Sequence, residues 1–290
     1  MLTEGRLLEG KFLAIQIQDE IKKTVESFHL QHKAPPRLVA LQAGVNPASD
    51  WYIHQQSKLT QKLGIRFEKI IVPENPQALE DKIKELNADS NTHGVFIAMP
   101  LPKGFDADKI LLALDPRKDV EGIHPTSLGL IVLRRAQLLP PTAYASFQLI
   151  ERAAREAGKP LKGLKAVIAG QSAIVGRPLQ LLLGEQRVTT FVCNTGTSAA
   201  DLQRLVSESD IVVGCAGQPG LIKGSWIKSG AIVIDVGTTE IEGKLVGDVE
   251  FDEARKRASY ITPVPGGVGP LTVTMLMQNL MRAYDWQSGK

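Results

Sequence analysis

The sequence is poor in cysteine and has no pattern of metal-ligating residues. Its 290 residues include two cysteines, Cys193 and Cys215, and five histidines. The cysteines are not spaced as Cys-x-x-Cys and the histidines form no cluster, so we expect no structural metal. Both cysteines lie in apolar, strand-like segments, which is typical of buried thiols in a reducing compartment.

The sequence also lacks long apolar runs and a strong bias of charge. No segment approaches the roughly 18 apolar residues of a membrane span, and residues 1–6 lack the basic and apolar regions of a secretory signal. The 34 basic and 31 acidic residues are scattered and give a net charge of +3, which argues against a nucleic-acid partner. We therefore expect a cytoplasmic protein that binds neither membranes nor nucleic acid.

Strand-like and helix-like segments alternate along the chain, which predicts parallel sheets covered by helices. Apolar residues recur at helical spacing over 10–29, and the first buried strand is expected at 37–41. The alternation breaks at two consecutive prolines, Pro140 and Pro141, and then resumes. We predict an α/β fold with two lobes, in which the last helix (271–284) crosses back to the first lobe. The lobes are expected to comprise residues 1–142 plus 271–290 and residues 143–270.

The second lobe contains a glycine-rich turn between a strand and a helix. Residues 170–178 (Gly-Gln-Ser-Ala-Ile-Val-Gly-Arg-Pro) follow a predicted strand at 165–169. The Gly-x-Ser-x-x-x-Gly spacing is a variant of the dinucleotide fingerprint, and the free amides of a helix N-terminus attract phosphate. A glycine-rich turn without a ligand is the simpler alternative. A second turn at 235–238, which also ends a strand, favours a nucleotide site.

The identity of the nucleotide stays open. The strand after the fingerprint is followed by neutral residues, Asn194 and Thr195, where an acidic residue would hold the ribose 2′-hydroxyl of NAD. A 2′-phosphate is therefore not excluded, and the cofactor is NADP or NAD. We expect the phosphates against the amides of residues 170–172, Thr195 near the ribose and Thr238 near the nicotinamide. The full set of cofactor-binding candidates is Gly170, Gln171, Ser172, Arg177, Thr195 and Thr238.

Polar side chains in the first lobe form a second candidate site. Tyr52 and Gln56 are four residues apart and share one face of a predicted helix. Asp119, Glu121 and His124 lie in a loop bounded by prolines. Each has a simpler interpretation: Tyr52 as a half-buried aromatic residue, Glu121 as a solvated charge and His124 as a satisfied loop histidine.

Residues 262–272 concentrate proline and glycine directly after a short strand. Proline fixes φ, and glycine permits a positive φ or a close approach to another surface. Such a loop is rigid and exposes backbone amides, which suits the binding of a planar ring. An ordinary rigid connection is the alternative.

Together these segments resemble the methylenetetrahydrofolate dehydrogenase/cyclohydrolase family over essentially the whole chain. The resemblance implies a folate-binding α/β lobe, a Rossmann-like NAD(P)-binding lobe and a cleft between them, usually in a homodimer. It also implies a tetrahydrofolate derivative as the substrate. The motifs that carry it are residues 44–52, 94–102, 118–125, 170–178, 233–237, 247–249 and 262–270.

The sequence departs from the family at several positions. The family lysine, four residues after the catalytic tyrosine, is Gln56 here, and the glutamine before the Pro-Leu-Pro turn is Ala98. The aspartate that holds the pterin ring is Glu121, and a frequent arginine of the phosphate turn is Gln171. Lys58 lies about 200° around the helix from Gln56 and cannot replace the lysine without distortion.

These departures affect the expected chemistry unequally. A desolvated lysine can exchange protons near neutrality, whereas a glutamine amide cannot. We therefore expect a methylenetetrahydrofolate dehydrogenase whose cyclohydrolase step is weak or absent. The catalytic candidates are Tyr52, Gln56 and Glu121, and the substrate-binding candidates are Tyr52, Ala98, Glu121, Pro265, Gly266 and Gly267.

Two alternatives remain. In a fully bifunctional enzyme, Tyr52 and bound water would compensate for Gln56. A diverged relative would instead act on another pterin-like substrate, or would bind folate and nucleotide as a regulator.

Overall fold

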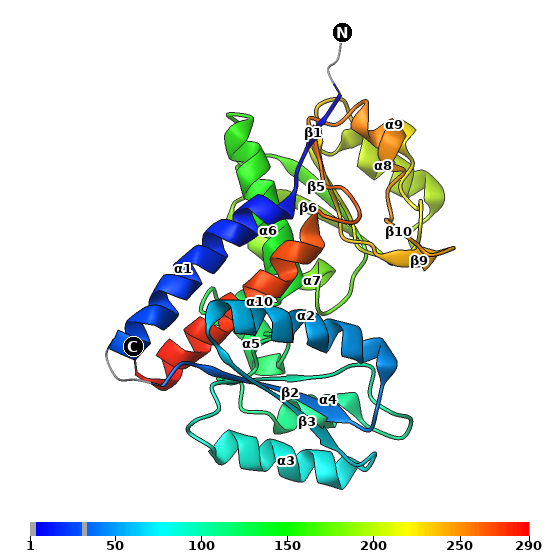
Figure 1. Ribbon diagram of the computed structural model, residues 1–290. Helices are drawn as coiled ribbons and strands as arrows, with labels where there is room; N and C mark the ends of the chain where they lie inside the picture. The colour runs from blue at the N-terminus through cyan, green and yellow to red at the C-terminus, as the bar shows by residue number, and fades with distance from the viewer. Residues whose placement is uncertain (1–3, 31–33, 290) are drawn as a thin grey trace. The chain divides into compact units, whose positions relative to one another are not determined.

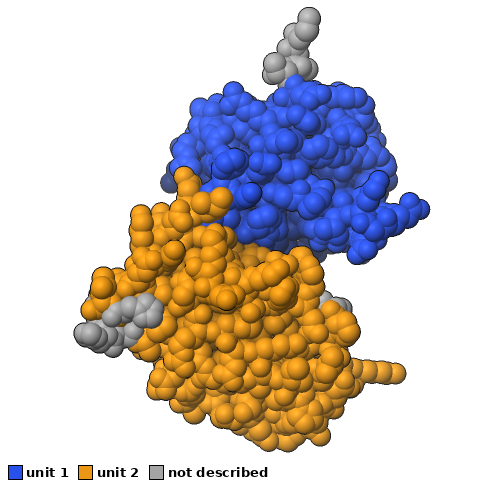
Figure 2. Space-filling model, in the orientation of Figure 1, with its two compact units in different colours: residues 1–14, 142–272 blue, residues 15–141, 273–290 orange. Residues whose placement is uncertain are grey.

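The computed structural model describes residues 4–30 and 34–289 and consists of two compact units (Figures 1 and 2). Unit 1 comprises residues 1–14 and 142–272, and unit 2 comprises residues 15–141 and 273–290. The predicted lobes differ from these units mainly at the N-terminus, which groups with unit 1. The reason is a short strand, β1 (Arg6–Leu7), which pairs in parallel with β11 (Tyr260–Ile261) of that unit.

Unit 2 is built on a three-stranded parallel sheet with the order β3-β2-β4. The central strand β2 (Arg37–Ala43) lies between β3 (Arg66–Val72) and β4 (Gly94–Ile97). Six of the seven residues of β2 are buried, as expected for a parallel strand covered on both faces. The helices that lie wholly or mainly in residues 15–141 of unit 2 are α1 (Gly10–Leu30), α2 (Pro47–Leu63), α3 (Pro76–Ala88), α4 (Ala107–Ala113) and α5 (Pro125–Val132).

The last helix, α10 (Val268–Gln287), belongs to unit 2 from residue 273 onward. Within unit 2 it runs beside α1 (Figure 1), where Gln18 donates a hydrogen bond to Thr274 at 2.8 Å. Near its end, the rings of Tyr284 and Phe28 lie 4.8 Å apart. The side-chain amide of Asn279 donates to the backbone carbonyls of residues 120 and 139 at 2.8 and 2.7 Å. The C-terminal helix therefore fixes both ends of the segment that contains α5.

Unit 1 is built on a six-stranded parallel sheet with the order β1-β11-β8-β7-β5-β6. After β1 at its edge, the chain returns to this sheet at β5 (Lys165–Ala169), continues to β6 (Thr189–Cys193) on one side, and then crosses to β7 (Ile211–Gly214) on the other side. The strand order therefore reverses at β5. In open α/β sheets, ligands bind in the crevice at the carboxyl ends of the strands where the order reverses.

Helices cover both faces of the unit 1 sheet, and a β-hairpin projects from it (Figure 1). A buried apolar core includes Val167 of β5, Val212 of β7 and Val233 of the next strand. The remaining elements are α6 (Pro141–Glu156), α7 (Gly176–Glu185), α8 (Ala199–Glu208), β8 (Ile232–Asp235), α9 (Phe251–Arg255), the 3₁₀ helix Gly224–Trp226, and the hairpin strands β9 (Thr239–Ile241) and β10 (Lys244–Val246). Among the described residues, no helix is long and apolar enough to cross a membrane.

Candidate functional site

Tyr52 lies on α2 and faces the edge of the unit 2 sheet. Its ring is half-buried and packs edge-on against Phe96 of β4, with centroids 5.8 Å apart and ring planes at 85°. Burial raises the pKa of the Tyr52 hydroxyl well above its ordinary value, and the charge of Glu121 raises this pKa further. Tyr52 therefore stays protonated at neutral pH and can both donate and accept a hydrogen bond.

Gln56 follows one helical turn later on the same face of α2. Its side chain is 0% exposed, and neither its amide nitrogen nor its amide oxygen forms a hydrogen bond. The amide approaches the Tyr52 hydroxyl without ideal hydrogen-bond geometry, and this weak hydrogen-bonding contact lowers the pKa of Tyr52 against the larger effect of burial. Buried polar groups in proteins are nearly always hydrogen-bonded, so Gln56 is an exception that requires an explanation.

Glu121 lies in a loop that is attached to the edge of the sheet. Asp119 forms a parallel bridge with Val95 of β4, and its buried carboxylate accepts hydrogen bonds from the backbone N–H groups of Glu121 and His124 at 3.2 and 2.7 Å. Lys118 donates its ammonium group to the backbone carbonyls of residues 86, 87 and 89 at 2.7, 2.9 and 2.7 Å. These bonds attach the loop that contains Glu121 to the end of α3 through Lys118 and to β4 through Asp119.

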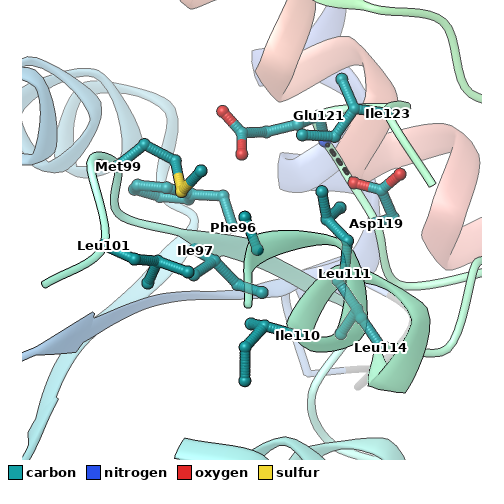
Figure 3. A pocket seen from close by; sticks show the side chains of 11 residues that line it. Phe96, Ile97, Met99, Leu101, Ile110, Leu111, Leu114, Asp119, Glu121 and Ile123 are labelled. Carbon is teal, nitrogen blue, oxygen red and sulfur yellow. Dashed lines mark hydrogen bonds between the residues drawn. The ribbon is translucent and has the colours of Figure 1, made fainter. Parts of the chain in front are cut away.

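The carboxylate of Glu121 points away from Asp119 (Figure 3). This carboxylate makes no hydrogen bond or ion pair with the described residues, whereas the backbone N–H of Glu121 donates to Asp119. Burial, with a smaller contribution from the charge of Asp119, raises the pKa of Glu121 to about 8. Burial also raises the pKa of Asp119 to about 6, against the opposing effect of its backbone hydrogen bonds. Tyr52 therefore lies close to both Gln56 and Glu121, because both groups affect its pKa.

Glu121 lies at one end of an apolar pocket (Figure 3). Phe96, Met99, Leu111 and Ile123 line the pocket, and the two acidic residues of the loop provide its polar end. Ala98 precedes Met99, is buried, and donates its backbone N–H to Leu41 of β2 at 2.9 Å. Its methyl group places no polar atom near the pocket.

The predicted ring-binding loop at Pro265, Gly266 and Gly267 belongs to unit 1, whereas Tyr52 and Glu121 belong to unit 2. The Val264–Pro265 peptide is cis, and Gly266 has a φ of 110°, which favours glycine. A side chain at Gly267 would lie 2.7 Å from the carbonyl oxygen of Pro263. The loop is therefore a tight turn that leads into α10.

The glycine-rich turn of unit 1 lies at the carboxyl end of β5. Gly170 has a φ of 132°, and a Cβ atom there would lie 2.3 Å from the carbonyl oxygen of Cys215. A Cβ atom at Gly176, the first residue of α7, would lie 2.0 Å from the carbonyl oxygen of Gly170. Both glycines are therefore required for the close packing of the turn. Gln171 and Ser172 between them are exposed, so this turn can present its backbone to a phosphate group.

The other cofactor candidates lie at the ends of the neighbouring strands. Thr195 is exposed in the loop after β6, and Thr238 is exposed after β8. The side chain of Asn194 donates a hydrogen bond to Gln171 at 3.0 Å and links the loops after β6 and β5. Arg177 is exposed in the first turn of α7. Sequence reasoning missed the Asn194–Gln171 link, because the two residues are 23 positions apart and no local pattern pairs them.

Two family models match the chain. The catalytic domain model of tetrahydrofolate dehydrogenase/cyclohydrolase matches residues 8–121, and the NAD(P)-binding domain model of the same family matches residues 140–288. The chain belongs to the tetrahydrofolate dehydrogenase/cyclohydrolase family. The predicted family and the predicted α/β fold class are thereby confirmed, while the roles of individual site residues remain predictions.

Relatives in this family match almost the full length of the chain. "Bifunctional protein FolD 1" of Hydrogenovibrio crunogenus is 41% identical over 282 residues, which are 96% of this chain and 97% of that protein. The solved structure of the FolD enzyme of Trypanosoma brucei, in complex with NADP and an inhibitor, is 36% identical with a TM-score of 0.91 and covers 99% of this chain and 100% of its own. The Campylobacter jejuni FolD structure is 36% identical with a TM-score of 0.89, covering 96% of this chain and 98% of its own.

Proposed function

We propose that the protein oxidises 5,10-methylenetetrahydrofolate to methenyltetrahydrofolate with NADP or NAD, and that it hydrolyses the product weakly or not at all. Membership of the family over both of its domains supports the dehydrogenase activity. The observation that carries the second part is Gln56, a buried amide beside Tyr52 that has no proton to exchange near neutrality.

The residues present fit a bound dinucleotide. Gly170 and Gly176 allow the turn after β5 to pack tightly, and the exposed amides of Gln171 and Ser172 can bind phosphate at the start of α7. The cofactor supplies the chemistry of hydride acceptance, and the protein supplies placement and electrostatics. Dehydrogenation therefore does not require the lysine that is absent from α2.

The residues of unit 2 suit placement of the folate. A pterin ring carries N–H donors on its aminopyrimidine edge, and a carboxylate can accept two of them. Glu121 is suited to this role because its carboxylate is not engaged by the described residues and it lies beside an apolar pocket. Tyr52 remains protonated near this carboxylate and can hydrogen-bond the substrate.

Hydrolysis of the methenyl bridge makes a different demand. Water must add to the methenyl carbon and a ring nitrogen must leave, which requires a group that gives and takes protons near neutrality. The amide of Gln56 cannot do so, the pKa of Tyr52 is raised, and Ala98 offers a methyl group. These features favour hydride transfer without efficient hydrolysis.

A fully bifunctional enzyme is the second candidate. Relatives that are 41% identical over 96% of this chain are named bifunctional. The pKa of Glu121 is raised to about 8, so one group near Tyr52 titrates close to neutrality and could exchange protons with water. In this candidate, Glu121 and Tyr52 together with water provide the proton exchange that the missing lysine would otherwise provide.

The deciding experiment measures both steps with one preparation. Formation of reduced nicotinamide from methylenetetrahydrofolate and NADP or NAD reports the dehydrogenase, and the decay of methenyltetrahydrofolate absorbance reports hydrolysis. Dehydrogenation without accelerated hydrolysis supports the proposal, and both activities support the bifunctional candidate. Tight folate binding without turnover would point instead to a regulator.

A further inference from the structure

Two buried aspartates connect the loops at the carboxyl edge of the unit 1 sheet. Asp235 is the last residue of β8, and Asp248 follows the hairpin formed by β9 and β10. Asp248 is 0% exposed and Asp235 is 4% exposed. Among the residues that the structure describes, no lysine, arginine or histidine forms an ion pair or a hydrogen bond with either carboxylate, and the hydrogen bonds that the two carboxylates accept come from backbone N–H groups.

Asp248 holds the loop that follows β7. Its Oδ2 atom accepts hydrogen bonds from the backbone N–H groups of Ala216 and Gly217 at 2.6 and 3.0 Å. The residue before them, Cys215, packs against the phosphate turn, because its carbonyl oxygen lies 2.3 Å from the position of a Cβ atom at Gly170. The carboxylate of Asp248 therefore fixes the position of the loop after β7, which packs beside Gly170.

The same carboxylate touches the loop that follows β8. Its Oδ1 atom is buried without a hydrogen-bond partner and lies 2.3 Å from the position that a Cβ atom would take at Gly237. Asp235 holds the same loop from the other side, because its Oδ1 atom accepts the backbone N–H of Gly237 at 3.1 Å. Asp235 also accepts the N–H groups of Asp248 and Val249, both at 2.9 Å.

Burial of a carboxylate with an unpartnered oxygen disfavours folding, and burial raises the pKa of Asp248. An apolar residue of similar size would avoid this desolvation, but it could not orient two backbone N–H groups. The buried carboxylate of Asp248 therefore lowers the stability of the fold but fixes the geometry of the loop that it holds.

We propose that Asp248, supported by Asp235, is a positioning residue for the nicotinamide half of the dinucleotide. It acts through the backbone of the loop after β7, which flanks the crevice at the strand-order reversal, and of the neighbouring loop after β8. This inference rests on the proposed binding of NADP or NAD at that edge. It assigns to these aspartates a role in cofactor affinity rather than in folate affinity or proton transfer.

The test compares cofactor affinity with stability in the full chain. Asp248→Ala removes the acceptor of two buried N–H groups, and we expect the dissociation constants of NADPH and NADH, measured by fluorescence titration, to rise about tenfold or more. The cofactor KM should rise in parallel, while the folate KM stays close to its original value. Asp248→Asn retains one acceptor oxygen for Ala216 and Gly217 and should recover most of the affinity.

Asp210→Ala is the matched control. Asp210 also anchors a backbone N–H with its carboxylate, that of Lys165 at 3.0 Å, but it does so at the start of β5, at the opposite edge of the same sheet. It should lower the melting temperature without changing the cofactor dissociation constants. If Asp248→Ala does not fold, the isosteric Asp235→Asn carries the test. One amide oxygen cannot replace two carboxylate oxygens that accept three N–H groups, so cofactor affinity should again fall.

Unchanged NADPH and NADH affinity in a folded Asp248→Ala or Asp235→Asn variant would overturn this inference alone. An equal loss of affinity in Asp210→Ala would also overturn it, because the effect would then be a general loss of stability. Failure of the unaltered protein to bind either nucleotide would overturn the proposed function and this inference with it.

Discussion

Asn194 donates a side-chain N–H to the amide oxygen of Gln171 at 3.0 Å, which joins the loops that follow β6 and β5. Both side chains are exposed and neutral. In dinucleotide-binding folds, the residue at the end of the second strand lies beside the adenosine ribose. A carboxylate there selects a 2′-hydroxyl, and an arginine nearby selects a 2′-phosphate. The Asn194–Gln171 pair provides neither charge.

The first prediction is therefore weak discrimination between NADP and NAD. We expect the two kcat/KM values to differ by less than about a hundredfold, because the charged pair that usually decides between them is missing. Gln171→Arg should shift the ratio toward NADP by about tenfold, through a bidentate contact with the 2′-phosphate. Gln186→Arg adds the same charge at the exposed end of α7 and should leave the ratio unchanged. A wild-type preference above this limit would contradict the prediction.

Much of the framework followed from local patterns. The strand predicted at 37–41 is observed as Arg37–Ala43, and the helix predicted at 10–29 is observed as Gly10–Leu30. The helix is marked by its apolar periodicity and the strand by a continuous apolar run, and both patterns reflect burial directly. The glycine-rich turn at Gly170 was also recognisable, because close backbone packing leaves glycine as the residue that fits. The same close packing requires glycine at Gly176, the first residue of α7.

Other features depend on distant contacts and left no local signal. The last helix, predicted from residue 271, begins at Val268, because Pro270 is tolerated in the first turn, where N–H groups have no helical partner. The sequence predicts a loop at His124, whereas its side chain caps α5 by accepting the N–H of Thr126 at 3.0 Å. The contacts of Lys118 and Asn279 join segments about 30 to 160 positions apart, so no periodicity reveals them.

The second prediction concerns the carboxyl group of Glu121. Glu121→Gln removes an acceptor for the N–H donors of the pterin, and folate affinity should fall about tenfold or more, because hydrogen bonds to charged groups are the stronger ones. The folate KM and turnover are the quantities to measure. Glu85→Gln, at an exposed position of α3, is a control in which both should remain unchanged. If neither quantity changes in Glu121→Gln, the assignment of Glu121 fails.

The pH dependence provides a separate check. The pKa of Glu121 is raised to about 8, so the carboxyl group is mostly protonated at neutral pH in the free protein. The ionised form accepts two N–H donors, and folate binding should therefore strengthen as the pH rises from 6 toward 8 and level off above about 8. Glu121→Gln should flatten this profile. A profile that is equally steep in the variant would assign the titration to another group.

The third prediction concerns the support of the Glu121 loop. Lys118 is 4% exposed and satisfies three backbone carbonyls near the end of α3. Lys118→Met keeps much of the side-chain volume but leaves these carbonyls without their donor, so the free energy of unfolding should fall by about 2–4 kcal/mol. Folate KM should rise as the adjacent loop shifts. Chemical denaturation measures the first effect, and Lys84→Met, on the exposed face of α3, should show neither.

The fourth prediction concerns hydrolysis of methenyltetrahydrofolate. Gln56 occupies a buried position beside Tyr52 but has no titratable proton, and Ala98 offers no polar group to orient Tyr52 or a water molecule. General acid–base catalysis typically contributes about 10²–10⁴-fold, and its loss should affect hydrolysis far more than hydride transfer. We expect the wild-type protein to hydrolyse methenyltetrahydrofolate at barely more than the uncatalysed rate.

Restoring the two family residues should restore part of this activity. Burial lowers the pKa of a lysine at position 56 toward neutrality, where it can exchange protons, so Gln56→Lys with Ala98→Gln should accelerate hydrolysis and Gln56→Lys alone should recover less. The decay of methenyltetrahydrofolate absorbance measures each variant. Gln61→Lys places the same charge on the exposed face of α2 and should have no effect. Robust wild-type hydrolysis that Tyr52→Phe abolishes would show instead that tyrosine and water suffice, and that Gln56 does not limit this step.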